Sequence, residues 1–314
     1  MVSPGRGPAT EGALSLMSWN IHYGVGRPDD RGALRDEVTV RGVLAGIAAV
    51  VKRHNPDILC LQEVDFDSRR THHIDQADFL AQALNFPYQA RVETWRVGYL
   101  PYPSWPPSQH YGAMRSGQVV LSRYPIEVHE VFGHPKPPSN PWWYNLFYLR
   151  RTTQRLVVDL GAGRRLALFN IHLEAFDGRN REAQAREVNA LAREVRSRGM
   201  AVVLMGDFNA IPAAATLRKA FPDEPETDMT DDTTISRVLA GTGLSDILAR
   251  AVGVPDGPGL WSFPSMDPPP NRRLDYILAP EEWTVVESSL VTDDPSLSDH
   301  LAVRALLVLP QSGG

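Results

Sequence analysis

Short clusters of polar side chains stand at the ends of several apolar runs along this chain. Four of them close an apolar run: Trp19-Asn20, Gln62-Glu63, Asn170-Ile171-His172 and Gly206-Asp207-Phe208-Asn209. Two more, Arg273-Leu274-Asp275-Tyr276 and Ser298-Asp299-His300, accompany the last apolar runs. An α/β scaffold presents the side chains at its strand ends to a crevice. The pattern therefore predicts a sheet protein with one polar site assembled from distant parts of the sequence.

Hydrophobic periodicity predicts more strands than long helices. Strands are expected at residues 14–21, 57–61, 118–121, 154–160, 165–171, 201–205, 274–278, 285–291 and 301–309. Helices are expected at residues 39–54, 75–84 and 180–198, where apolar residues recur at helical spacing. The strands do not alternate regularly with helices, which favours two packed sheets flanked by helices over a simple parallel sheet.

Length and composition indicate a globular protein. The 314 residues are 43% hydrophobic and 22% charged, and Gly, Pro and Ser are frequent before residue 13. We therefore expect a disordered lead-in over residues 1–13 and one domain over residues 14–310. No signal peptide or membrane-length apolar stretch is recognised, so a cytoplasmic location is the expectation. Cys60 lies within an apolar run and is expected to be a buried, inert thiol.

The charge pattern gives no positive support for tight nucleic-acid binding. The formal net charge is −5, and basic residues occur as isolated pairs such as Arg150-Arg151. Salt-driven binding to DNA needs clustered cations. A locally basic cleft remains open as an alternative.

The residue types in the polar clusters suit a hard divalent cation and phosphate chemistry. Asn20, Glu63 and Asp299 are oxygen donors, which favour Mg²⁺ or Mn²⁺ over a thiolate-bound metal. His300 is a candidate general base that Asp275 orients, and His172 is a candidate donor to a phosphoryl oxygen.

Residue spacing adds an expectation about which side chains face the site. Asp207 and Asn209 are two positions apart, as are Asn170 and His172. On an extended backbone, each pair would point to the same face.

The clusters together resemble the endonuclease/exonuclease/phosphatase superfamily of metal-dependent phosphoesterases, including its deoxyribonuclease-like and sphingomyelinase-like branches. The similar segments follow the family's order: Ser18-Trp19-Asn20, Leu61-Gln62-Glu63, residues 118–125, Asn170-Ile171-His172-Leu173, Gly206-Asp207-Phe208-Asn209, residues 273–277 and Leu297-Ser298-Asp299-His300. The resemblance implies a four-layer α/β sandwich with two mainly antiparallel or mixed sheets.

The resemblance also implies a role for each matching residue. Glu63 would be the principal ligand of Mg²⁺ or Mn²⁺, assisted by Asn20 and Asp299. Asp207 and Asn209 would align the attacking water and the phosphate. His300, paired with Asp275, would act in proton transfer, and His172 would bind the scissile phosphate. The implied reaction is in-line attack of an activated water on a phosphodiester substrate, and no obligate protein partner is implied.

Departures from the family pattern concern substrate contacts. Abasic-site endonucleases of the family carry Asn at the position of His172, so His172 favours the deoxyribonuclease, sphingomyelinase and phosphatase branches. Gln118 stands where many members have Asn. Gln118, Asn170 and Tyr111 are taken as candidate substrate-binding residues.

Two segments rich in Pro and aromatic residues, 95–107 and 133–151, are expected to be functional loops or packed flaps. Trp142 and Trp143 are candidate substrate-binding residues there. The second segment could contact a membrane surface, stack the bases of a single strand, or pack over one end of the sandwich. The function expected is a metal-dependent phosphodiesterase, as a nuclease acting on DNA or RNA. The alternatives are a phospholipase C or sphingomyelinase-like enzyme, an inositol-phosphate phosphatase, or a non-catalytic binding module.

Overall fold

The computed structural model describes residues 12–27, 34–103 and 105–310. Its twelve strands form two six-stranded sheets. The first sheet has the order β11 (Thr284–Val291), β12 (Ala302–Val308), β1 (Ala13–Asn20), β2 (Ile58–Asp65), β4 (Gly112–Ser122) and β3 (Tyr88–Leu100). The second has the order β5 (Ile126–Gly133), β6 (Thr152–Asp159), β7 (Arg165–His172), β8 (Ala201–Asp207), β10 (Asp275–Pro280) and β9 (Leu244–Asp246).

Both sheets are mixed. The β1–β2 and β7–β8 pairs are parallel, and the remaining neighbours are antiparallel. The two parallel pairs lie near the middle of their sheets, so the carboxyl ends of four strands come together. This convergence places the last residues of β1, β7 and β8 at one edge of the sandwich.

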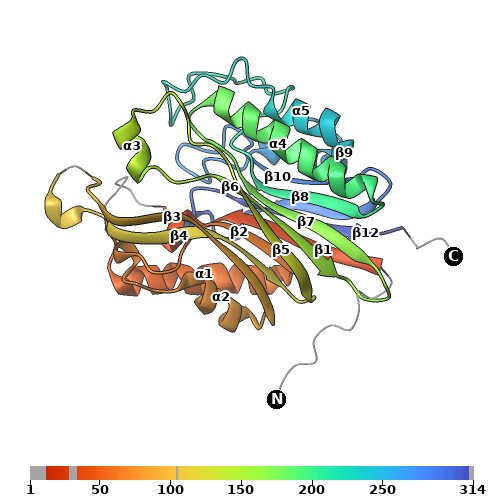
Figure 1. The fold of residues 1–314 in the computed structure, drawn as a ribbon, viewed down its shortest axis with the longest axis horizontal. Helices are drawn as coiled ribbons and strands as arrows, with labels where there is room; N and C mark the ends of the chain where they lie inside the picture. Colours follow the sequence, from red (N-terminus) through yellow and green to blue (C-terminus); the bar gives the residue numbers. More distant parts are fainter. Residues whose placement is uncertain (1–11, 28–33, 104, 311–314) are drawn as a thin grey trace.

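Helices cover the outer face of each sheet, giving four layers (Figure 1). Helices α1 (Glu37–His54) and α2 (Gln76–Leu84) pack on the first sheet, and α4 (Gly178–Ser197) and α5 (Thr234–Thr242) pack on the second. Strand β1 shows how the layers arise. Its Leu14 and Leu16 pack against the second sheet, while Met17 and Trp19 pack against the helical layer. The α/β sandwich predicted from the sequence is confirmed.

Local signals place the main helices. The Asp36 carboxylate accepts a hydrogen bond from the Thr39 amide at 2.7 Å and begins α1, which ends at Asn55 in a left-handed conformation. Asp177 begins α4 in the same way, through the Asn180 amide at 2.9 Å. The turn at residues 161–163 joins β6 to β7 in an antiparallel hairpin.

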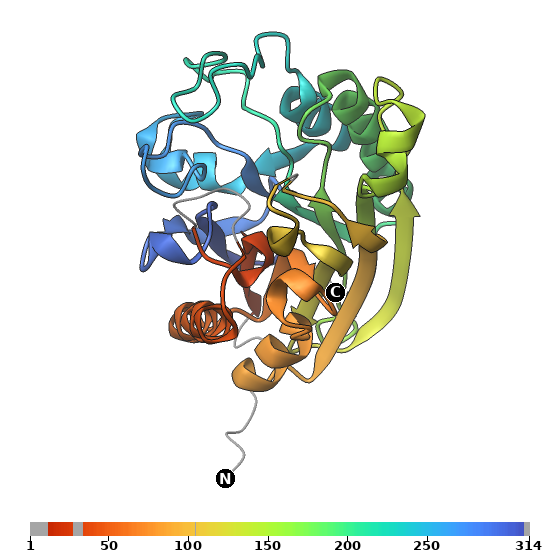
Figure 2. The same ribbon diagram turned by 90° about the vertical axis from the view of Figure 1, so that its left-hand side faces the viewer.

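The structure corrects the prediction for the two aromatic segments. Residues 95–100, expected to be a loop, belong to β3, and the segment 133–151 contains a short helix, α3 (Trp142–Phe147). Figures 1 and 2 show α3 and the β3–β4 connection at the same end of the molecule. Strands β3 and β5 were not predicted, although Tyr88, Ala90 and Val92 alternate with polar residues in β3; both are edge strands with few or no buried positions and lack a continuous apolar run.

Three shorter elements were also not predicted: α5, β9 and α6 (Ile247–Val252). Most of the predicted disordered lead-in lies outside the described residues, and Ala13 already belongs to β1. Among the described helices, none has the length and apolar character needed to cross a bilayer.

Candidate active site

Five strands deliver polar side chains to the edge where the two sheets meet. Asn20 ends β1, His172 ends β7, and Asp207 ends β8. Asp275 begins β10 and pairs directly with Asp207 across the antiparallel ladder. Asn20 lies on the side of β1 that faces the second sheet, so residues of both sheets meet in one site.

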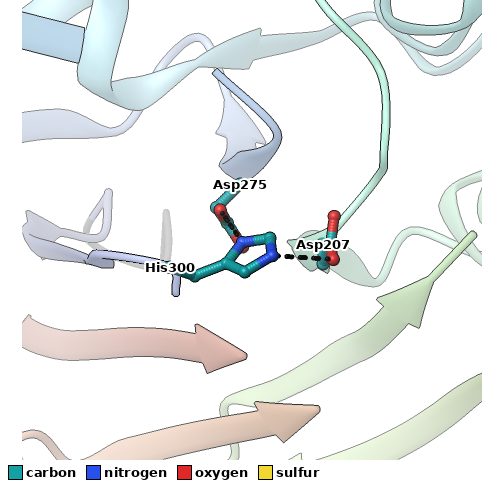
Figure 3. A group of neighbouring side chains, drawn as sticks. All are labelled: Asp207, Asp275 and His300. Carbon is teal, nitrogen blue, oxygen red and sulfur yellow. Dashed lines mark hydrogen bonds and ion pairs between the residues drawn. The ribbon is translucent and has the colours of Figure 1, made fainter. Parts of the chain in front are cut away.

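A chain of three side chains forms the centre of this site (Figure 3). The His300 Nδ1 lies 2.8 Å from Asp275 Oδ2, and the His300 Nε2 lies 3.8 Å from Asp207 Oδ2. The Ser262 hydroxyl donates to the same Asp275 oxygen at 2.6 Å, and the Trp19 indole donates to the His300 carbonyl at 2.9 Å. The structure contains the predicted pairing of His300 with Asp275. Ser262 also holds Asp275, and Trp19 also holds His300.

A distortion of β2 turns Glu63 toward the cleft. The register of β2 against β4 shifts between Leu61 and Val64, which is the mark of a β-bulge, and Glu63 has a φ of 55°. A non-glycine residue in this region costs about 1 kcal/mol or more and is typical of functional sites. The bulge leaves Gln62 fully buried and gives the Glu63 side chain an exposed fraction of 25%.

The Asn20 carboxamide joins the two halves of the site. Its Nδ2 lies 3.3 Å from Glu63 Oε1 and 3.1 Å from Asp207 Oδ2, and it donates to both carboxylates. Its Oδ1 accepts a hydrogen bond from the His22 amide at 3.1 Å. Asn20, Glu63 and Asp207 are thus within direct contact of one another.

His172 faces the same carboxylates, and it is accompanied by a cation. Its Nε2 lies 3.8 Å from Glu63 Oε1 and 3.6 Å from Asp207 Oδ2, and it contacts the Nη1 of Arg151. Burial, followed by Arg151 and His300, lowers the pKa of His172 well below its usual value. His172 is therefore neutral, and its Nε2 accepts from Arg151, so Arg151 is the positively charged donor at this place.

The carboxylates and His300 shift each other's protonation. Burial alone would lower the pKa of His300, but Asp275 and Asp207 outweigh burial and raise this pKa to about 10. Burial raises the pKa of Asp207 to about 7, with Asp275 adding to the rise and His300 opposing it. The two carboxylates thus favour the protonated, donating form of His300 over the general base expected from the sequence, and the raised pKa of Asp207 makes this carboxylate the candidate acceptor.

The donor set fits a hard divalent cation. Glu63 and Asp299 line the same cleft, and neither has an Arg or Lys ion-pair partner among the described residues. Burial raises the pKa of the Tyr23 phenol, and the charges of both carboxylates add to this rise. Carboxylate and amide oxygens are the preferred ligands of Mg²⁺. Glu63, Asn20 and Asp299 are therefore the residues that could hold such an ion.

A second group of possible ligands suits proton transfer better. Ligand atoms of Asp207, Asp275 and His300 lie within 4.8 Å of one another. However, the His300 Nδ1 is already bonded to Asp275, which is fully buried, and a protonated imidazole cannot bind a metal. We therefore treat this trio as a proton-transfer chain.

The site opens into a large cleft with two different walls. The cleft has a volume of about 1510 Å³. One wall is aromatic and is lined by Tyr23, Trp95, Tyr102, Tyr111, Phe147 and Tyr148. The other wall carries carboxylates, namely Asp223, Glu224, Glu226 and Asp228. Tyr111 thus lies in the cleft, where the sequence placed a substrate contact.

Two candidate substrate-binding residues lie in the protein interior instead. Gln118 is 1% exposed and accepts a hydrogen bond from Thr152, and Asn170 is fully buried. The Asn170 side chain bonds to Gln62 and Gln154 at 2.7 and 2.8 Å. Neither residue lines the cleft, because both side chains point between the sheets, where a buried amide needs protein partners.

Three further residues differ from the positions expected. Asn209 has a φ of 49°, so it is not on an extended backbone, and its side chain donates to the Leu173 carbonyl at 3.0 Å. Trp142 and Trp143 are exposed on α3 and are absent from the lining of the cleft. The alternation rule failed at Asn209 because β8 ends at Asp207.

Comparisons with known proteins agree with this architecture. A sequence model of the Endonuclease/Exonuclease/phosphatase family matches residues 17–300. An endonuclease/exonuclease/phosphatase structure from Beutenbergia cavernae is 27% identical, covers 95% of this chain and 72% of that chain, and has a TM-score of 0.67.

More distant structures share the fold. A mannosyl-6-phosphatase from Bacteroides thetaiotaomicron is 18% identical, with 94% of this chain and 100% of that chain covered and a TM-score of 0.61. TDP2 from C. elegans is 22% identical, with coverages of 95% and 75% and a TM-score of 0.56.

One curated relative is an inositol phosphosphingolipids phospholipase C from Schizosaccharomyces pombe. It is 24% identical over 237 residues, which are 63% of this chain and 53% of the relative. The chain thus spans about half the length of this relative. The family match over residues 17–300, together with the strand-end site, shows that the chain belongs to the Endonuclease/Exonuclease/phosphatase family of phosphoester hydrolases.

Proposed function

We propose that this protein is a divalent-metal-dependent phosphodiesterase in which an activated water attacks phosphorus in line. The observation that carries the proposal is the Asp275–His300–Asp207 chain beside the cleft-facing Glu63 and the Asn20 amide. One side of the site supplies oxygen ligands, and the other side supplies groups that exchange protons.

The residues divide the chemistry between them. Glu63, Asn20 and Asp299 would hold Mg²⁺ or Mn²⁺, which when bound polarises the phosphoryl oxygen and makes water more acidic. Asp207 accepts the proton of the attacking water, and Asp275 keeps His300 oriented as a donor to developing negative charge. Arg151, held at the site by its contact with His172, binds a phosphoryl oxygen.

Removing the charge of Glu63, the principal metal ligand, tests the proposal. Glu63→Gln keeps the shape of the side chain but removes its charge, so metal-supported hydrolysis of bis(p-nitrophenyl) phosphate should fall by about 100-fold or more. Chelation of the wild type should abolish turnover, and added Mg²⁺ or Mn²⁺ should restore it. Glu281→Gln, at the exposed β10–β11 turn, is the matched control. Unchanged turnover in Glu63→Gln would refute the metal assignment.

The charge of the cleft supports a phospholipid substrate over a nucleic acid. Asp223 and Glu224 in the cleft are paired with Arg272, but Glu226 and Asp228 have no Arg or Lys ion-pair partner among the described residues and would repel a strand with one phosphate per nucleotide. A phospholipid headgroup with a single phosphodiester avoids this repulsion. The phospholipase C activity in the name of the Schizosaccharomyces pombe relative belongs to the same chemical class. We therefore favour a phospholipase C or sphingomyelinase-like activity over a nuclease activity.

A substrate panel separates the two classes. Plasmid DNA, oligonucleotides, sphingomyelin vesicles and inositol phosphates are each incubated with Mg²⁺ or Mn²⁺, and phosphate or headgroup release is measured. Turnover of vesicles with no cleavage of DNA is the expected result. Preferred cleavage of oligonucleotides would contradict the lipid assignment and leave the phosphodiesterase assignment intact.

A further inference from the structure

Bulky apolar side chains from three segments are exposed at one end of the molecule. Trp105 lies in the β3–β4 connection, Trp142, Trp143 and Leu146 lie on α3, and Phe176 lies between β7 and α4. Their exposed fractions are 79%, 77%, 54%, 64% and 81%, respectively. Scattered single apolar residues are common on protein surfaces, but a group from separate loops indicates an interaction surface. We call these five residues the aromatic rim.

Hydrogen bonds tie the α3 segment to its neighbours on two sides. The Trp95 indole of β3 donates to the Phe147 carbonyl of α3 at 2.6 Å, and the Arg150 amide donates to the Thr94 carbonyl at 2.8 Å. The Ser139 hydroxyl, just before α3, donates to Asp177 at the start of α4 at 2.6 Å. The residues of the rim on α3 and before α4 thus belong to linked segments, and Figure 2 shows α3 and the β3–β4 connection on the face turned to the viewer.

The rim borders the mouth of the active-site cleft. Tyr102, Phe147 and Phe176 line the cleft, and each is next to or part of a segment of the rim. A second hollow of about 260 Å³ is lined by Tyr144 and Phe176, so α3 and the β7–α4 loop face each other there. A surface that docks through the rim would lie directly at the entrance to Glu63 and Asp207.

The aromatic side chains of α3 are not explained by packing in the protein core. None of the residues from Trp142 to Phe147 is buried, although four of these six are aromatic. A helix this short is not stable by itself in water, and hydrogen bonds to neighbouring segments hold this one in place. Its Trp side chains are thus displayed to the solvent without contributing to the core.

Basic side chains lie beside the rim. Lys136 donates to the Asn145 carbonyl of α3, and Arg150 follows α3 in the chain and is exposed. Arg179 is exposed at the start of α4, where its charge acts on the neighbouring Asp177. Although the net charge of the protein is −5, three basic side chains thus lie beside its exposed tryptophans.

We infer that the aromatic rim is a docking surface for an anionic lipid bilayer, with its tryptophans at the headgroup level and Lys136, Arg150 and Arg179 at the lipid phosphates. Trp side chains prefer the membrane–water interface, because an apolar ring and an N–H donor suit that boundary. Each Lys or Arg near an anionic leaflet adds to the attraction. The inference goes beyond the proposed hydrolysis, and it does not depend on which ester is cleaved.

Vesicle co-sedimentation tests the inference with the full chain. Wild-type protein should bind vesicles of phosphatidylcholine with 30% phosphatidylserine more tightly than pure phosphatidylcholine vesicles, and added salt should weaken this binding. Trp142→Ala/Trp143→Ala should weaken binding by about tenfold or more, because two large apolar side chains are lost from the interface. Arg150→Gln should weaken binding to the anionic vesicles by about fivefold.

Tyr88→Ala provides the matched control. Tyr88 is a 39% exposed aromatic residue at the opposite end of β3, and its loss should leave vesicle binding unchanged. The tryptophan variant should keep wild-type turnover of bis(p-nitrophenyl) phosphate and a wild-type unfolding midpoint, which separates docking from catalysis and from folding.

Four outcomes would overturn the inference. Wild-type protein that binds neither vesicle composition, or vesicle binding that persists in the tryptophan variant, excludes a lipid-docking role. A wild-type dimer that the tryptophan variant converts to monomer, without vesicle binding, would assign the rim to self-association. Single-stranded oligonucleotide binding that is lost in this variant, again without vesicle binding, would assign the rim to base stacking.

Discussion

His300 lies between two carboxylates that do different work. Asp275 is fully buried and bonded to His300 and Ser262, so it orients the imidazole without access to the cleft. Asp207 faces Asn20 and His172 and takes part in the site where water would attack. Two chemically identical groups thus receive different roles from burial and hydrogen bonding alone.

Asp275→Asn tests this division at the scale of one residue. The amide cannot stabilise the protonated His300, so kcat should fall by about 100-fold to 10,000-fold while KM changes little. Steady-state kinetics with bis(p-nitrophenyl) phosphate measure both constants. Asp231→Asn, on an exposed loop, is the control and should behave as the wild type. A fall in the unfolding midpoint that alone accounts for the lost activity would argue against the orienting role.

Much of the site was predictable from residue types at strand ends. Asn20, Glu63, His172, Asp207, Asp275 and His300 meet in the structure as the sequence pattern suggested. Arg151 was recognised only as half of an Arg pair, because its contact with His172 is made across the β6–β7 ladder. Ser262 carried no signal, since a lone Ser in a loop gives no hint of its partner.

Backbone conformation explains the residues that the sequence did not reveal. His22 and Tyr23 have φ values of 45° and 52°, although neither is glycine. This turn places the Tyr23 ring 3.4 Å from the Arg70 guanidinium carbon and the His22 Nδ1 3.9 Å from Asp299. Left-handed conformations at non-glycine residues depend on tertiary contacts, so a sequence pattern does not predict them.

At the scale of elements, the close approach of β7 and β8 depends on Gly206. This residue has a φ of 144°, and a Cβ at its position would lie 2.0 Å from the Ile171 carbonyl oxygen. The two strands are parallel neighbours that carry His172 and Asp207 side by side. A glycine at position 206 is therefore required for the spacing of two active-site groups.

Gly206→Ala should force these strands apart. The expected loss in the free energy of unfolding is about 3 kcal/mol or more, because backbone atoms rather than a flexible side chain must move. Urea denaturation followed by circular dichroism measures it. Gly199→Ala, which also has a positive φ but open space around it, should cost only about 1 kcal/mol. Equal losses in the two variants would show that the positive φ, and not the close contact with Ile171, determines the cost of alanine at position 206.

Hydrophobic periodicity did not predict the edge strands or the short exposed helix. Strands β2, β7 and β8 were predicted well because continuous apolar runs reflect burial on both faces. Strand β3 has two buried residues and β5 has none, so neither carries the continuous apolar run of a central strand. The aromatic segment 133–151 misled the prediction for a related reason, since its helix α3 buries nothing.

At the scale of the whole molecule, the charge of the cleft bears on the proposed choice of substrate. The carboxylates of Glu226 and Asp228 are exposed in the lining of the cleft. Their potential extends about 10 Å at an ionic strength of 0.1 M, which is far enough to act on a substrate that enters the cleft.

Reversal of these charges should admit polyanions. Glu226→Lys/Asp228→Lys is expected to lower the KM for an oligonucleotide by about tenfold at low salt and to make it more dependent on ionic strength. Glu281→Lys/Glu282→Lys makes the same change in net charge at the β10–β11 turn and serves as the control. A similar gain in both double variants would show that overall charge, and not the charge of the cleft, governs access.

The position of β12 has a consequence for biosynthesis. This strand lies between β11 and β1 in the first sheet, and His300 precedes it. On the ribosome, β1 is made long before its neighbour β12, so this side of β1 stays unpaired until residues 302–308 have been made. The same stretch of the chain brings His300 to Asp275 and Asp207. A nascent chain that ends before residue 300 therefore holds no complete site.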